Sequence, residues 1–402
     1  MRRYRKFMAV MCVVLTMALI FAGCGSKETE GTKAETKTEE TKAKETTEAD
    51  KEETTTVAKT TEEEAGSEVL DEIISAFEKE TGAWTEWTGP TDGPKIAEGK
   101  TIAIINQDSS NGGEALWGDA VAEACEVAGW EYVIMDGQGD VTTEMSCFSQ
   151  AIALGVDGIV TSANTSNLQA SIEEAKEKGI PTVGIHASAT VGPDEKENLL
   201  YNNTSDPKSI GHAIADYAIA DSQGKGKVVI IYNANHSIAS VKGEAMKERV
   251  EQAGMEVLEF YTIGDDWATT LPSKMASWIS TYGDDFYVLC IADAFFDYLI
   301  PTIRNAGAEN IQLIGSDGEN AAYERIRKGE YQVATVPEPG LLFGYMCVDE
   351  LNRYFNGEEQ YVWSPQMHIV TKDNVDSEGG TDSVWTPGNN FQDHYKEIWG
   401  VQ

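Results

Sequence analysis

The sequence predicts an α/β protein made of two lobes, each built around a parallel β-sheet. From Lys100 onward, short runs rich in Val and Ile alternate with amphipathic stretches of about a dozen residues. This alternation restarts after Gly224. Strands that alternate with helices form parallel sheets covered by helices, so two such series predict two α/β lobes. The 402 residues suffice for two domains of ordinary size.

Each series contains five predicted strands. They are Thr101–Ile105, Glu131–Met135, Gly158–Thr161, Thr182–His186 and Leu199–Asn202, then Val228–Tyr232, Val257–Tyr261, Tyr287–Ile291, Gln312–Gly315 and Gln332–Val336.

Amphipathic stretches between the strands predict helices. Examples are Glu114–Ala128, Gln169–Lys178, Asp206–Ala220, Val241–Ala253 and Phe295–Ala306. Glycines at or near the ends of such stretches are expected to terminate helices in the left-handed conformation. These are Gly129, Gly179, Gly254 and Gly307.

The N-terminus carries a targeting signal. Basic residues precede Phe7–Gly23, which is almost entirely apolar. The run is shorter than the ~20 residues of a membrane-spanning helix, so residues 1–23 are predicted to be a signal peptide. It ends in Phe21-Ala22-Gly23-Cys24, which resembles the lipobox of bacterial lipoproteins. We therefore expect a lipid on Cys24 that anchors the chain to the extracytoplasmic face of the cell membrane; an uncleaved anchor helix is the alternative.

Two segments separate this signal from the lobes. Residues 24–66 consist mostly of Lys, Glu, Thr and Ala without an aromatic residue, which predicts a disordered acidic tether. Its root-mean-square reach is roughly 35 Å. Residues 67–99 begin with apolar residues at helical spacing and continue with the turn-rich stretch Trp84–Pro94. We expect a helix, followed by an arm that packs on the folded domain.

Charge and cysteine content exclude several classes of protein. With 31 Lys and Arg against 67 Asp and Glu, the formal charge is -36, which excludes a nucleic-acid-binding role. Cys12 lies in the signal peptide. The four cysteines within the lobes show no CxxC spacing, so we expect buried thiols and no disulfide or metal site. They are Cys125, Cys147, Cys290 and Cys347.

No catalytic motif stands out. The sequence contains no GxxxxGK[ST] loop, HExxH or GxSxG, and its five histidines lack metal-like spacing. We therefore expect a protein that is not an enzyme and that uses neither a cofactor nor a metal. A carboxylate pair for glycoside hydrolysis is defined by spatial separation, so an extracellular hydrolase stays an alternative.

Short motifs follow the predicted strands in a fixed order. They are Ile105-Asn106-Gln107-Asp108 with Asn111-Gly112-Gly113, Met135-Asp136-Gly137-Gln138-Gly139, Ala151-Ile152-Ala153 with Gly155-Val156-Asp157-Gly158-Ile159, Gly179-Ile180-Pro181, Ile314-Gly315-Ser316-Asp317-Gly318 and Ala334-Thr335-Val336. In this order and spacing, the chain from about Lys100 to about Lys372 resembles the type I periplasmic-binding proteins of the ribose-binding kind. The segment Trp87–Lys95 resembles a lipoprotein subgroup of that family.

The resemblance implies two Rossmann-like lobes that are joined by a three-strand hinge and close on a ligand. The three segments that cross from one lobe to the other would lie near Asn203, Glu338 and His368. The N-terminal lobe would take residues 100–205 and 339–366. The C-terminal lobe would take 206–338 and, with the tail, 367–402. The tail after Lys372 is not explained by the resemblance.

Open α/β sheets bind ligands outside the carboxyl ends of their strands. Those ends are rich here in amides and carboxylates, which suit sugar hydroxyls. The candidates are Asn106, Asp108, Asn111, Asp136, Gln138, Asn164, Asn203, Asn235, Asp293, Asp317 and Glu338. Aromatic rings that suit the C–H face of a sugar are Trp117, Trp267, Phe295 and Phe296. Helix caps and turns are the alternative for the polar residues, and core packing is the alternative for Trp117.

The resemblance carries ligand contact to four of these positions, Asn111, Asp136, Asp317 and Glu338, and to Lys242 in addition. Two departures change the expected specificity. Ser110 and the pair His186-Ala187 replace Arg or Asp-Arg of many relatives, and Ala292 replaces an Asn. We therefore include His186 among the ligand-binding candidates and expect a specificity other than that of the ribose-binding prototype.

Arginine is scarce where a ligand would bind. After the signal peptide it occurs only within predicted helices, at Arg249, Arg304, Arg325, Arg327 and Arg353. Because anionic ligands are usually held by Arg or by helix N-termini, a neutral polyol is favoured, with a cation or nucleoside as alternatives.

The sequence thus predicts a monomeric, extracytoplasmic substrate-binding protein that captures a monosaccharide or polyol for an ABC importer, with the membrane permease as partner. The alternatives are a ligand-sensing co-receptor of a histidine kinase or chemoreceptor, and a binder of a nucleoside or autoinducer.

Overall fold

The computed structural model describes residues 68–110, 112–264, 266–378 and 385–402. The predicted signal peptide, the tether, Cys24 and Asn111 lie outside these residues. Within the described part of the chain, no helix has the length and apolar character needed to cross a bilayer.

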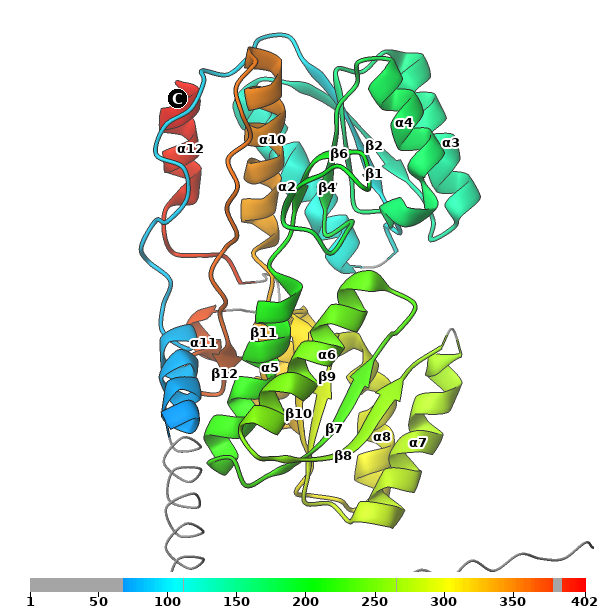
Figure 1. Ribbon diagram of the computed structural model, residues 1–402, viewed down its shortest axis with the longest axis vertical. Helices are drawn as coiled ribbons and strands as arrows, with labels where there is room; N and C mark the ends of the chain where they lie inside the picture. Colours follow the sequence, from blue (N-terminus) through cyan, green and yellow to red (C-terminus); the bar gives the residue numbers. More distant parts are fainter. Residues whose placement is uncertain (1–67, 111, 265, 379–384) are drawn as a thin grey trace, which may run out of the picture. The chain divides into compact units, whose positions relative to one another are not determined.

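The N-terminal lobe is a six-stranded sheet with helices on both faces (Figure 1). The strand order is β2-β1-β3-β4-β6-β5, and only the β5–β6 pair is antiparallel. The strands are β1 (Thr101–Asn106), β2 (Glu131–Asp136), β3 (Gly158–Thr161), β4 (Thr182–Ile185), β5 (Gly192–Asp194) and β6 (Leu199–Asn203). The helices are α2 (Gly112–Ala128), α3 (Val141–Leu154), η1 (Thr165–Asn167), α4 (Gln169–Glu177) and α10 (Gly340–Asn356).

The side chains of β1 alternate between the two faces of this sheet. Ile102 and Ile104 are buried in the core that includes residues of α2 and α10. Ala103 and Ile105 are buried in the core that includes residues of α3 and α4. A strand covered on both faces reads as a continuous apolar run, which is why the sequence pattern located it.

The C-terminal lobe repeats this architecture with the order β12-β11-β10-β9-β7-β8, in which only β12 is antiparallel. Its strands are β7 (Lys227–Tyr232), β8 (Glu256–Thr262), β9 (Tyr287–Cys290), β10 (Gln312–Asp317), β11 (Gln332–Pro337) and β12 (Val370–Thr371). Its helices are α5 (Pro207–Ser222), α6 (Ser237–Gln252), α7 (Trp267–Tyr282), η2 (Asp293–Phe295), α8 (Phe296–Ala306), α9 (Asn320–Lys328) and α11 (Val375–Glu378).

The predicted fold class, two α/β lobes with parallel sheets, is confirmed. Every predicted strand is present, and the four glycines predicted to end helices have φ between 64° and 81°. The four described cysteines are buried with free thiols. The sequence did not predict β5 and β12, which are short and pair antiparallel at sheet edges.

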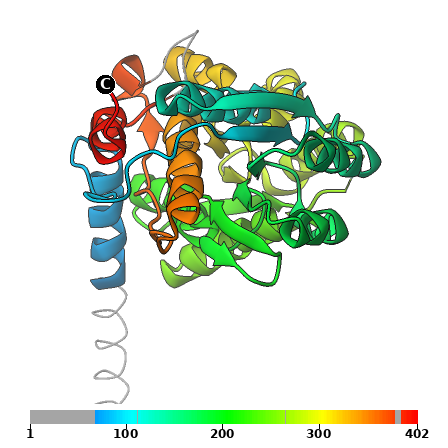
Figure 2. The same ribbon diagram turned by 90° about the horizontal axis from the view of Figure 1, so that it is seen from above.

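The chain passes between the lobes after β6, after β11 and over residues 357–369. A helix over residues 68–80 packs on the C-terminal lobe, where Ile73 is fully buried. The arm then continues to the N-terminal lobe, where the Ile96 N–H donates to the Trp399 carbonyl at 3.0 Å. The tail differs from the expectation for 367–402. Its last helix, α12 (Phe391–Trp399), packs beside α10 of the N-terminal lobe (Figure 2).

Aromatic side chains join the arm to the tail. Trp84 stacks on Trp385 with ring centroids 6.0 Å apart, and Trp87 stacks on His394 at 5.0 Å. Trp87 also contacts Trp363 at 5.3 Å, in the third crossing segment. The Trp84–Pro94 stretch is therefore a packed arm, as its composition predicted.

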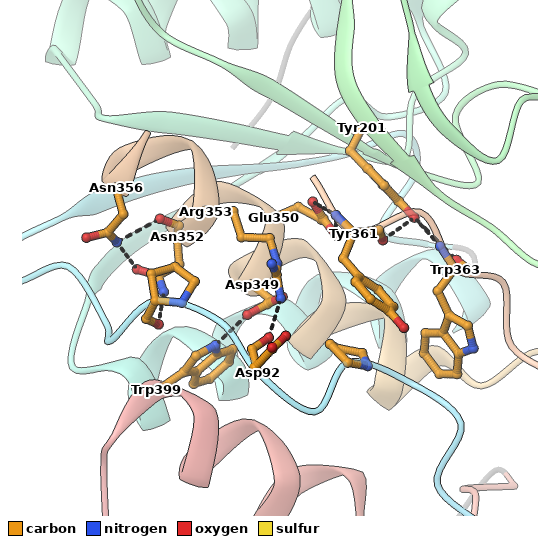
Figure 3. A network of polar contacts seen from close by, with 12 residues as sticks. Asp92, Tyr201, Asp349, Glu350, Asn352, Arg353, Asn356, Tyr361, Trp363 and Trp399 are labelled. Carbon is orange, nitrogen blue, oxygen red and sulfur yellow. Dashed lines mark hydrogen bonds and ion pairs between the residues drawn. The ribbon is translucent and has the colours of Figure 1, made fainter. Parts of the chain in front are cut away.

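A polar network fastens the arm and α12 to α10 (Figure 3). The Arg353 guanidinium donates to Asp349 at 2.8 Å and to the Asp92 carbonyl at 2.9 Å. The Trp399 indole donates to the other Asp349 oxygen at 2.8 Å, and Asn352 donates to the Pro94 carbonyl at 3.0 Å. These contacts anchor the arm, the tail and α10 to one another.

Candidate ligand-binding site

A buried ion-pair network links the two lobes where β11 crosses into α10. Glu338 follows β11, and one of its carboxylate oxygens lies 3.4 Å from Lys242 Nζ of α6. The other lies 3.2 Å from His186 Nδ1, just after β4. The site therefore contains groups from both lobes and from a crossing segment.

Glu338 is only 5% exposed. Burial alone would raise its pKa, but the charges of His186 and Lys242 and their hydrogen bonds lower that pKa to about 2. Glu338 is therefore ionised at neutral pH. The buried carboxylate forms a structural ion pair with Lys242 at the hinge.

Lys242 is buried to 3% exposure and has three oxygen neighbours. Its Nζ lies 3.4 Å from Ser316 Oγ and 3.6 Å from Asp317 Oδ1, in addition to Glu338. Burial alone would lower the Lys242 pKa, but Glu338 and then Asp317 raise it above its usual value. The ammonium is therefore charged and is largely neutralised by the two carboxylates.

His186 adopts a left-handed backbone conformation, with φ of 51°. Its Nδ1 lies 2.9 Å from Thr204 Oγ1, and the Thr204 hydroxyl donates to the Ser205 carbonyl at 3.0 Å. Because that hydroxyl hydrogen is already used, Nδ1 carries the proton and donates to Thr204 Oγ1. The Trp117 ring lies 5.4 Å from the imidazole, so His186 and Trp117 form one surface.

Asp317 ends β10 with φ of 92°, which is unusual for a non-glycine residue. Its side chain is 38% exposed, unlike those of Lys242 and Glu338. Strained residues at strand ends persist where the surrounding structure holds them, and they are common at binding sites. Asp317 therefore presents a carboxylate that an incoming ligand can reach.

Asp293 was predicted to contact ligand, but it is fully buried within the C-terminal lobe. Its carboxyl group bonds to Thr335 at 2.6 Å, to Gln332 at 2.7 Å and to the Gly318 N–H at 3.1 Å. Burial raises the pKa of Asp293 to about 8, although the Thr335 hydrogen bond lowers it. Asp293 therefore does not reach the ligand side of the site; it stabilises the strained Asp317-Gly318 turn by accepting the Gly318 N–H.

Asn203 also has a supporting place. Its side chain has no exposed surface, and its amide lies 3.1 Å from Cys347 Sγ of α10. Phe296, an aromatic candidate, is fully buried in the core of the C-terminal lobe. A strand-end Asp or Asn has the same local sequence whether its side chain turns inward or outward, so the sequence could not separate these cases.

The carboxyl ends of β1 and β2 bring a second polar group together in the N-terminal lobe. Asp136 accepts hydrogen bonds from the backbone N–H groups of Ser109 at 2.9 Å and Gln138 at 3.0 Å. These bonds lower the Asp136 pKa. Asp108 accepts from the Ser110 N–H and hydroxyl. Both carboxylates hold loops in place and remain accessible.

The other candidates lie apart from the ion-pair network. Asn164 caps the η1 turn through the Ser166 N–H, and Asn235 is exposed in the loop after β7. Trp267 packs edge-on against Phe295, with centroids 5.0 Å apart. Among the described residues, none of these four forms a hydrogen bond, ion pair or ring contact with Glu338, Lys242 or His186.

The sequence missed Glu114, Glu319 and His236. Burial is the main cause that raises the pKa of Glu114 to about 7, and the charges of Asp108 and Asp317 add to it. Burial and Asp317 raise the pKa of Glu319 to about 7. Burial, and then the nearby His186 and Lys242, lower the pKa of His236. Glu114 lies in the first turn of α2, where acidic residues are common, so its sequence gave no signal.

The sequence model of a family described as "Periplasmic binding protein domain" matches residues 102–359. The search of curated proteins gave no match. An ABC sugar transporter subunit from Rhodobacter sphaeroides 2.4.1 is 21% identical with a TM-score of 0.59, over 68% of this chain and 99% of that chain.

Two ligand-bound structures are also similar. An ABC transporter solute-binding protein from Agrobacterium vitis with bound alpha-D-tagatopyranose is 16% identical, with a TM-score of 0.62, over 71% of this chain and 99% of that one. An ABC transporter solute-binding protein from Mycobacterium smegmatis with bound glycerol is 18% identical, with a TM-score of 0.62. The match covers 72% of this chain and 99% of that one. At these identities the likeness shows the fold, and the family match spans more than half of the chain. The chain belongs to the periplasmic-binding-protein domain family and has the two-lobed fold of its type I members.

Proposed function

We propose that the chain is an extracytoplasmic substrate-binding protein that captures a sugar or polyol and delivers it to an ABC importer. A lipid on Cys24 holds it beside the membrane permease. The family membership supports capture of a solute outside the cytoplasm. The similar structures whose descriptions name tagatopyranose, glycerol and a sugar transporter support the ligand class.

The observation that carries the proposal is the Glu338 carboxylate held between Lys242 and His186. This cluster lies near the carboxyl ends of strands in both sheets, and its position supports ligand binding there, as in other open α/β folds. Asp317 offers hydrogen-bond acceptors to hydroxyl groups, and the Trp117 ring offers an apolar face. Because these groups come from different lobes, a ligand that contacts both favours the closed arrangement of the lobes.

A thermal-shift series on the mature chain, expressed without residues 1–24, tests the proposal. The panel contains pentoses, hexoses, polyols, amino sugars, nucleosides and amino acids. A ligand at a thousand times its dissociation constant adds about 4 kcal/mol, which raises the melting temperature by several degrees. We expect this rise from a sugar or polyol. A rise only with nucleosides or amino acids contradicts the proposed ligand class.

A further inference from the structure

Negative charge exceeds positive charge around the site. Asp108 and Glu114 belong to the N-terminal lobe, and Asp317 and Glu319 belong to the C-terminal lobe. The charge of Asp317 acts on both Glu114 and Glu319. Lys242 is the cation in contact with this group, and Glu338 already neutralises it at 3.4 Å. The carboxyl groups around the site therefore outnumber the protein cations near them.

The described arginines supply little compensating positive charge. Four of them form ion pairs with other carboxylates, and Arg304 lies in the last turn of α8. Arg325 lowers the pKa of Glu319, but no arginine is among the main groups that act on Glu114. The paired ones are Arg249 with Asp216, Arg325 with Asp297, Arg327 with Glu324 and Arg353 with Asp349. The excess of carboxyl groups at the site is thus a property of the folded protein.

Glu114 gives an independent indication of what is missing. Its Oε2 is shielded from solvent and has no hydrogen-bond partner among the described residues. The Ser162 hydroxyl bonds to the carboxyl group, and the charged groups near enough to raise its pKa are the carboxylates of Asp108, Asp317 and Glu144. A buried carboxylate oxygen without a donor is costly, so the site is suited to a partner that brings both N–H donors and positive charge.

We propose that the bound sugar or polyol carries a protonated amine, and that Glu114 of the N-terminal lobe and Asp317 of the C-terminal lobe receive it. An ammonium group has three donors and one positive charge, so it can satisfy both carboxylates at once. A neutral hydroxyl brings one donor and leaves the two carboxylates repelling each other. This inference rests on the proposed function and narrows its ligand class to amino sugars and amino polyols.

Binding of such a ligand depends on pH. Burial and the neighbouring carboxylates raise the pKa of Glu114 to about 7, so its carboxyl group is partly protonated at neutral pH. An ammonium favours the ionised carboxylate and displaces that proton. The affinity for an amine ligand therefore rises between pH 6 and pH 7.5, with release of a proton, whereas the affinity for a neutral ligand changes less.

Calorimetric titration of the mature chain with matched pairs of compounds tests the inference. The pairs are glucosamine with glucose, galactosamine with galactose, mannosamine with mannose, and glucamine with glucitol. We expect the amine of at least one pair to bind at least tenfold more tightly than its neutral partner at pH 7.5, with a smaller ratio at pH 6. Equal or tighter binding of the neutral compounds overturns the inference and leaves the proposed function standing. Binding of none of these compounds, together with no response to other sugars or polyols, contradicts both.

Glu114→Gln separates the carboxylate's charge from its shape. We expect this variant to lose at least tenfold in affinity for the amine and to keep its affinity for the neutral partner within about twofold. Glu80→Gln is the matched control. Glu80 also has a buried, unpartnered Oε2 and a pKa raised to about 7, but it lies in the helix over residues 68–80, near Asp216 and Arg249. Equal losses in the two variants, or no loss in Glu114→Gln, contradict the assignment.

Discussion

Glu338 and Lys242 form an ion pair at 3.4 Å with both side chains no more than 4% exposed, and the pair joins a crossing segment to α6 of the C-terminal lobe. Charges removed from water to this degree lose hydration that only a good partner offsets. Lys242 also lies 3.6 Å from Asp317, so the same ion pair holds the hinge together and sets the charge around Asp317 at the proposed binding site. Stability and ligand binding are therefore coupled at this point.

Breaking this pair from one side is expected to destabilise the protein strongly. Lys242→Met leaves the buried Glu338 carboxylate without its lysine partner, so the free energy of unfolding should fall by about 3–5 kcal/mol. The double variant Lys242→Met, Glu338→Gln should recover part of that loss, because no unpaired charge remains. Urea unfolding of the two single variants and the double variant measures the coupling. Additive losses would contradict an ion pair of this kind.

Stability is expected to rise as pH falls from 8 to 6. Five carboxyl groups have pKa values raised to about 7 or above, chiefly by burial: Glu80, Glu114, Asp293, Glu319 and Glu350. When the pH is above their ordinary pKa values, these carboxyl groups bind more protons in the folded state than in the unfolded state. Their contribution to stability is therefore lost as the pH rises toward the raised pKa values of about 7 to 9. His212 and His236, whose pKa values are lowered, oppose this trend but are fewer.

Melting temperatures between pH 6 and pH 8 check this expectation. Glu350→Gln mimics the protonated side chain and keeps an acceptor for the Tyr361 N–H, so it should flatten the pH dependence. Glu248→Gln, at an exposed carboxylate paired with Lys208, should leave the dependence unchanged. A melting temperature that rises with pH over this range would show that the buried carboxyl groups are ionised in the folded state.

The stacked tryptophans of the arm and the tail are expected to contribute to stability. Trp385 is 2% exposed and stacks on both Trp84 and His368, so Trp385→Ala leaves a large cavity and should cost about 3–5 kcal/mol. Tyr354→Ala, at a side chain 41% exposed, should change unfolding free energy by about 0.5 kcal/mol or less. Urea unfolding compares them. Equal effects would mean that the tail folds independently of the arm.

Substitution of Asp317 by glycine should relieve backbone strain but weaken the affinity of the protein for ligand. Glycine adopts a φ of 92° without a steric penalty, so Asp317→Gly should be about 1 kcal/mol more stable to unfolding than Asp317→Ala, which loses the same carboxylate near Lys242. The same change removes the accessible carboxylate and should weaken ligand binding. Paired unfolding and titration experiments test both effects. A glycine variant that is no more stable than the alanine variant would argue against strain at this residue.

The sequence predicted the central strands of both sheets because they are buried on both faces, so each is a continuous run rich in Val and Ile. The edge strands β2 and β8 are partly exposed but still carry several apolar residues. The short edge strands β5 and β12 lack such runs. The position of α12 could not be predicted, because it depends on stacking between Trp84, Trp87 and residues about three hundred positions further along the chain.

The candidate site was also predicted only in part, because some of its groups interact only across the two lobes. Lys242, His186, Asp317 and Glu338 were identified, and the structure brings them together. Glu114 was missed, because its importance comes from burial and from Asp317 in the other lobe, which no local pattern contains.

Titration calorimetry with the sugar or polyol that gives the largest thermal shift tests the location of the site most directly. The comparison is between the wild type, Asp317→Asn and the control Asp376→Asn. Asp376 lies in the tail, and its exposed carboxylate pairs with Arg327 of α9. Binding at one site in the wild type, at least tenfold weaker in Asp317→Asn and unchanged in Asp376→Asn, is the predicted result. Undiminished affinity in Asp317→Asn would place the ligand elsewhere and contradict the account.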